Sequence, residues 1–131
     1  MKTAQKTVLV VDDDPKILKA VSLRLTAAGY RTLAVWNGAE ALFVAKAERP
    51  DLIIADVWMP VGMGLSMAHR LREFAPDVPV VFLTADKGEK LKNMSRAVGA
   101  AAFLEKPYSP EVLLATVAGV LKTSASTHPN H

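Results

Sequence analysis

Short apolar runs alternate along the chain with longer segments whose apolar residues recur every three or four positions. The short runs predict five strands, over residues 8–11, 31–35, 52–55, 78–83 and 101–104. Runs without polar residues, such as the first and the third, are typical of strands that are covered on both faces. The longer segments predict five helices, over residues 15–28, 38–49, 65–74, 89–98 and 110–121.

Local signals mark where several of these helices begin and end. Asp14, Asn37 and Ser109 stand where an N-cap residue is expected. Gly29 is expected to end the first helix, and Pro50 follows the end of the second. Strict alternation of strands and helices predicts an α/β fold, a parallel sheet with helices on both faces.

The length of 131 residues corresponds to one domain, which we place at residues 7–122. Residues 123–131 hold mostly Ser, Thr, Pro, Asn and His, and we predict a flexible C-terminal tail or a severed linker. The domain length leaves no room for a second folded unit such as a separate DNA-binding domain.

Composition excludes several classes of function. The chain has no cysteine, which excludes disulfide scaffolds, thiolate zinc sites and cysteine nucleophiles. No apolar run reaches the ~20 residues of a membrane span, and no secretory signal is visible, so we predict a cytoplasmic protein with no membrane partner. The net charge is only +3, and Asp86 and Glu89 lie among the basic residues Lys87, Lys90, Lys92 and Arg96, so direct nucleic-acid binding is not expected.

Chemically active residues stand where the predicted strands end. Asp12 and Asp13 follow the first strand, Asp56 the third, Thr84 the fourth and Lys106 the fifth. In parallel sheets, sites form outside the carboxyl ends of the strands, so these side chains are expected to converge. Clustered carboxylates repel each other unless a cation intervenes, and an all-oxygen ligand set favours Mg2+. Carboxylates, Mg2+, a lysine and a hydroxyl suit phosphoryl transfer, with Asp56 as the nucleophile.

Four motifs make the chain resemble the receiver domain of two-component response regulators, including the chemotaxis response regulators. They are VLVVDDDP at residues 8–15, DLIIADVWMP at 51–60, FLTA at 82–85 and FLEKPY at 103–108. The resemblance implies a flavodoxin-like, doubly wound sheet with strand order 2-1-3-4-5. It also implies a signalling protein rather than a turnover enzyme.

The resemblance assigns roles to individual residues. Asp56 matches the phosphoacceptor, and Lys106 and Thr84 match the residues that contact the phosphoryl group. The implied Mg2+ ligands are Asp12, Asp13, Asp56 and the backbone carbonyl of Trp58. Thr84 and Phe103 match the pair that couples phosphorylation to a distant face, while Ala85, Asp86 and Pro107 flank the site.

The implied phosphoryl donor is a histidine kinase or a phosphotransfer protein. Phosphorylation would switch the face of the fourth helix, fifth strand and fifth helix for a downstream target, for the protein's own output domain or for a phosphorylation-dependent dimer. The loop after Asp56 departs from the family pattern, with Val61 and Met63 in place of the usual glycine and aspartate.

Two alternative functions remain open at this point. Asp12 and Asp14 after an apolar strand also resemble the signature of haloacid-dehalogenase-like phosphatases, in which Asp12 would be the nucleophile. The chain could instead be a pseudo-receiver, a binding module that keeps the fold without being phosphorylated. Identifying which aspartate is modified would separate these alternatives.

Overall fold

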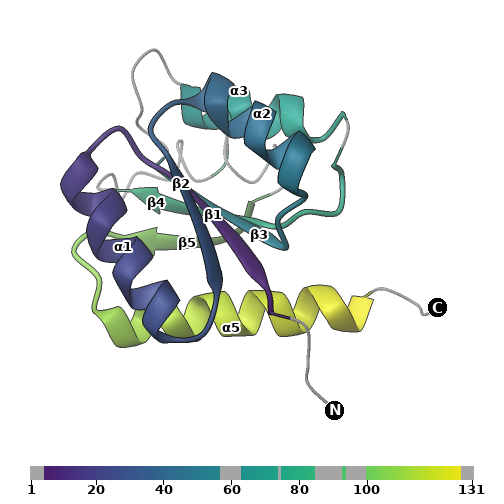
Figure 1. Ribbon diagram of the computed structural model, residues 1–131. Coiled ribbons are helices and arrows are strands. Elements are labelled where there is room, and N and C mark those ends of the chain that lie inside the picture. The colour runs from purple at the N-terminus through teal and green to yellow at the C-terminus, as the bar shows by residue number, and fades with distance from the viewer. Residues whose placement is uncertain (1–4, 57–62, 74, 85–92, 94–99, 128–131) are drawn as a thin grey trace.

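Five parallel strands form one sheet with the order β2-β1-β3-β4-β5, as the resemblance to receiver domains implies (Figure 1). The computed structural model describes residues 5–56, 63–73, 75–84, 93 and 100–127. The strands are β1 (Thr7–Val11), β2 (Arg31–Val35), β3 (Leu52–Asp56), β4 (Val80–Thr84) and β5 (Ala100–Glu105). The three central strands are buried along their whole length, which explains why each contains a run of four apolar residues with no polar residue between them.

Helices cover both faces of the sheet (Figure 1). They are α1 (Pro15–Ala27), α2 (Gly38–Glu48), α3 (Met63–Leu71) and α5 (Pro110–Thr127). Successive strand residues point to opposite faces, so Leu9 packs in a core with α2 and α3 while Val10 packs in a core with α1 and α5. The result is a three-layer α/β sandwich, and the flavodoxin-like prediction is confirmed.

The predicted helix signals have the expected geometry. The side chain of Asp14 accepts a hydrogen bond from the Lys16 backbone N–H at 2.9 Å. Ser109 Oγ accepts one from the Val112 N–H at 3.1 Å. Gly29 follows α1 with φ of 101°, a backbone conformation that glycine adopts at little cost. These local bonds fix where α1 and α5 begin and where the chain turns back into β2.

Replacing Asn37 with alanine is expected to lower the free energy of unfolding by about 1 kcal/mol. Asn37 Oδ1 accepts a hydrogen bond from the Glu40 backbone N–H at 2.7 Å, at the start of α2. Alanine leaves that N–H without its capping partner. Urea titration should detect the loss, and Asn37→Ser, which can still cap, should recover most of it. Equal stability of the alanine and serine variants would contradict the assignment.

Several element boundaries differ from the sequence prediction. Strand β4 begins at Val80 rather than at residue 78, because Pro79 has no N–H to donate to the ladder. Helix α3 spans 63–71 rather than 65–74. Helix α5 continues to Thr127, beyond the predicted end at residue 121, so residues 123–127 are helical rather than an unstructured tail. Apart from Asn93, the predicted helix over 89–98 lies outside the described residues.

Candidate functional site

The parallel register brings the carboxyl ends of the strands to one edge of the sheet. Val11 of β1 lies beside Ala55 of β3, so Asp12 and Asp56 are in neighbouring positions. The backbone N–H of Lys106 donates to the Thr84 carbonyl at 2.8 Å, which continues the pairing of β5 with β4 by one residue. The strand pairing of the sheet therefore brings four predicted site residues to one edge: Asp12, Asp56, Thr84 and Lys106.

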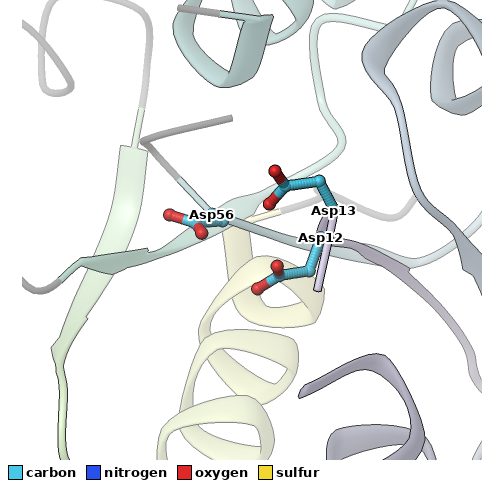
Figure 2. A group of neighbouring side chains, drawn as sticks. All are labelled: Asp12, Asp13 and Asp56. Carbon is cyan, nitrogen blue, oxygen red and sulfur yellow. The ribbon is translucent and has the colours of Figure 1, made fainter. Parts of the chain in front are cut away.

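Three carboxylates gather at this edge (Figure 2). Asp12, Asp13 and Asp56 each offer an oxygen, and these oxygens all lie within 4.8 Å of one another. The Asp12 side chain is completely buried, Asp56 is nearly buried, and Asp13 is exposed. The cluster is therefore open to solvent on the side of Asp13.

Lys106 supplies the positive charge of the site. Its Nζ lies 3.3 Å from Asp56 Oδ2 and 3.9 Å from Asp12 Oδ2. The lysine is itself partly exposed, so its ammonium group lies at the rim of the cluster. One lysine cannot neutralise three carboxylates, and the site keeps an excess of negative charge.

The charge of Asp12 is poorly compensated in this structure. The pKa of Asp12 is raised to about 6, mainly by burial and to a smaller extent by the carboxylates of Asp56 and Asp13, while the Asp14 N–H and Lys106 act in the opposite direction. The Asp14 N–H donates to Asp12 Oδ1 at 2.9 Å. Oδ2 is buried and has no hydrogen-bond partner among the described residues. A buried carboxylate oxygen that accepts no hydrogen bond is unusual, and a bound cation would satisfy it.

The donor set fits a hard divalent cation. All three side chains offer oxygen, and among the described residues Asp12 Oδ2 has no hydrogen-bond donor, only the Lys106 ammonium at 3.9 Å. Mg2+ binds through a few carboxylates and keeps several waters, which suits a cluster that is open on one side. The structure thus supports a cation site at the carboxyl ends of β1 and β3.

The predicted switch residues Thr84 and Phe103 lie on the adjacent strands β4 and β5. Thr84 is buried at the end of β4. Phe103 on β5 is partly buried and packs on Phe82 of β4, with ring centroids 6.5 Å apart and an interplanar angle of 27°. Pro107 is exposed, and the peptide bond that precedes it is cis. Trp58, Ala85 and Asp86 lie outside the described residues.

Tyr108, the last residue of the FLEKPY motif, is a neighbour of the site. Burial raises the pKa of its phenol, and the charges of Asp12 and Asp56 add to this effect. The hydroxyl therefore stays protonated at neutral pH, within electrostatic reach of the carboxylates. Its position two residues after Lys106 is the sequence signal that points to this location.

Comparison with known protein families identifies the class of protein to which this fold and this carboxylate cluster belong. The family model of the response regulator receiver domain matches residues 8–118, and the chain belongs to this family. The predicted family is thereby confirmed. In the described part of the chain, no helix has the length and apolarity that crossing a bilayer requires.

Individual relatives are similar over nearly the whole chain. The phosphate regulon transcriptional regulatory protein PhoB of Pseudomonas aeruginosa is 37% identical over 119 residues, which are 89% of this chain and 52% of that protein. The alkaline phosphatase synthesis transcriptional regulatory protein PhoP of Bacillus subtilis is 34% identical over 95% of this chain and 52% of its own length. The chain thus spans about half the length of these curated relatives.

Solved structures agree with the fold. The chemotaxis protein CheY4 of Vibrio cholerae superposes with a TM-score of 0.86 at 39% identity, covering 89% of this chain and 99% of that one. The BeF3-activated DrrB receiver domain superposes with a TM-score of 0.81 at 30% identity, covering 91% and 99%. Both are similar to this chain along almost their entire length.

Proposed function

We propose that this chain accepts a phosphoryl group on Asp56 from the phosphohistidine of a histidine kinase or a phosphotransfer protein. The observation that carries the proposal is the meeting of three carboxylates within 4.8 Å, with Lys106 Nζ 3.3 Å from Asp56. Membership of the receiver family agrees with this chemistry. The protein would signal by its phosphorylation state rather than by turnover of a substrate.

Accessibility favours Asp56 over Asp12 as the acceptor. The Asp12 side chain has no exposed surface, and one of its oxygens is bonded to the Asp14 N–H. The Asp56 side chain is 11% exposed and lies at the end of β3, between Asp12 and Lys106. A phosphoryl donor can reach Asp56 with less rearrangement, which disfavours the phosphatase-like alternative with Asp12 as nucleophile.

The proposed step is an in-line displacement at phosphorus. A carboxylate oxygen of Asp56 forms the new O–P bond, the N–P bond of the donor breaks, and its electron pair stays on the imidazole nitrogen. The Lys106 ammonium stabilises the charge on the transferring oxygens. A bound Mg2+ would neutralise charge on the same oxygens, and Asp12, Asp13, Asp56 and the Trp58 carbonyl would hold it.

We further propose that the phosphoryl group is read by Thr84 and Phe103. The Thr84 hydroxyl would bond to it, and Phe103, which packs on Phe82, would change its packing in response. Ala85, Asp86 and Pro107 would border the group. The phosphate would stabilise one arrangement of Thr84 and Phe103 over the other. It would thereby shift the conformational equilibrium of the β5–α5 side of the domain. A downstream protein, an output domain of the same protein or a second receiver would bind that side.

Wild-type protein incubated with acetyl phosphate is expected to gain one phosphoryl group when Mg2+ is present and almost none in excess EDTA. The reason is that the acidic cluster repels an anionic donor until a cation lowers its charge. Intact-mass spectrometry measures the adduct directly. Absence of any adduct from acetyl phosphate, phosphoramidate and a phosphorylated histidine kinase would favour the pseudo-receiver and contradict the proposal.

A further inference from the structure

The outer side of α2 carries apolar residues that the domain itself does not cover. Ala39, Phe43 and Ala47 recur at every fourth position and are all exposed, and Phe43 is 74% exposed. The inner side of the same helix buries Ala41 and Ala45 against the sheet. A helix that is apolar on both sides is normally covered on both sides. This stripe is therefore a candidate contact surface.

The sequence of α2 is symmetric about Phe43. Phe43 is the central residue of the eleven-residue helix Gly38–Glu48. Ala39 and Ala47 stand four positions before and after it. Glu40 and Lys46, which carry opposite charges, stand three positions before and after it. The side chains of Phe43, of both alanines and of both charged residues are exposed. A two-fold axis at Phe43 would therefore pair unlike charges and like apolar residues.

We propose that the outer side of α2 is a homodimer interface in which a second copy of the chain docks antiparallel across Phe43. Phe43 would contact Phe43 of the partner subunit at the axis. Glu40 would pair with Lys46 of the partner subunit, and the symmetric pair would form as well. The small side chains of Ala39 and Ala47 would let the two helix axes approach closely.

A groove beside Phe43 extends the contact toward α3. It has a volume of about 270 Å3 and is lined by Leu42, Phe43, Lys46, Arg70 and Glu73. Its wall thus combines apolar surface with charges of both signs, as a self-complementary contact requires. The apolar edge of the partner subunit's α2 would fill this groove. The charged residues of α3 and of the turn after it would lie at the rim.

The expected dimer is weak. An eleven-residue helix is about 16 Å long, so this contact falls below the ~800 Å2 per partner of stable interfaces. We therefore expect association to be detectable only at high protein concentration. The contact is also separate from the β5–α5 side, because α2 and α3 lie on the other face of the sheet from α1 and α5 (Figure 1).

Sedimentation velocity over a concentration series of the unphosphorylated wild-type chain tests the proposal. The weight-average sedimentation coefficient should rise with concentration for wild type. Phe43→Glu should raise the dissociation constant by roughly tenfold or more, because it places two like charges at the axis. Leu23→Glu is the matched control. Leu23 is 61% exposed on α1, and its variant should associate like wild type.

Charge reversal distinguishes this antiparallel pairing from general stickiness of Phe43. Glu40→Lys and Lys46→Glu should each weaken the dimer about fivefold, because each places like charges opposite one another. The double variant exchanges the charges and should restore wild-type association. Both Glu40→Lys and the double variant lose the favourable acidic residue in the first turn of α2. Recovery of dimerisation in the double variant therefore reports the contact between residues 40 and 46 of the two subunits.

Three results would overturn the proposal. The first is a wild-type chain that stays monomeric at every concentration. The second is a Phe43→Glu variant that associates like wild type. The third is a dimer that is lost in Val112→Glu instead, since Val112 is exposed on α5 and reports the other face. Far-ultraviolet circular dichroism of each variant verifies that the fold is retained.

Discussion

Asp56→Asn is expected to lose the Mg2+-dependent phosphoryl adduct completely. The amide has nearly the same shape as the carboxylate but is not a nucleophile toward phosphorus. The side chain forms an ion pair with Lys106 at 3.3 Å, so the substitution also removes the charge that holds the ammonium near the acceptor. Intact-mass spectrometry after incubation with acetyl phosphate and Mg2+ measures the effect.

Asp14→Asn is the matched control for this loss. Asp14 is the neighbouring acidic residue that caps α1, and asparagine caps equally well. This variant should gain the phosphoryl group like wild type. An adduct that survives in Asp56→Asn would contradict the assignment of the acceptor. It would direct attention to Asp12 and reopen the phosphatase-like alternative.

Asp12→Asn is expected to make the Mg2+-free protein more stable by about 2 kcal/mol around neutral pH. Burial raises the pKa of Asp12 from 3.8 to about 6. The folded state therefore binds this proton more tightly than the unfolded state, and the free energy of unfolding falls as pH rises between these two values. Above that window both states are charged, and the full penalty of about 3 kcal/mol applies. Asparagine carries no charge and therefore removes this penalty, although it also loses the longer ion pair with Lys106.

Urea titrations of wild type and Asp12→Asn across the acid range, with and without Mg2+, measure this effect. Wild type should lose stability between the two pKa values, and the variant should follow a flatter profile. Mg2+ should stabilise wild type by mass action and the variant much less. A variant less stable than wild type in excess EDTA would show that the Asp12 carboxylate is not under strain. Residues that serve binding commonly lower the stability of the folded protein in this way.

Much of the site could be predicted because it depends on local pattern and on one general rule of topology. Apolar runs that end in Asp12, Asp56 and Thr84 mark strand ends, and parallel strands bring such ends to one edge. Capping by Asp14 and Asn37 involves bonds within three residues, so sequence alone indicates it. Helix α5 was predicted too short because its apolar stripe ends before the helix does. Residues 122–127 contain no glycine or proline, and a formed helix extends at little cost.

The sequence by itself determined the alternation of strands and helices and the residues that meet at the carboxyl edge, because these follow from periodicity and from the geometry of parallel sheets. Its motifs determined the family, and the strand order followed from the resemblance to that family. Only the tertiary structure decided how each residue is used. Asp12 and Asp13 are adjacent and identical in type, yet one is buried with a raised pKa and the other is exposed. Phe43 is a large apolar residue, yet its side chain is exposed. Burial depends on what other segments pack against a side chain, and that is a property of the whole fold.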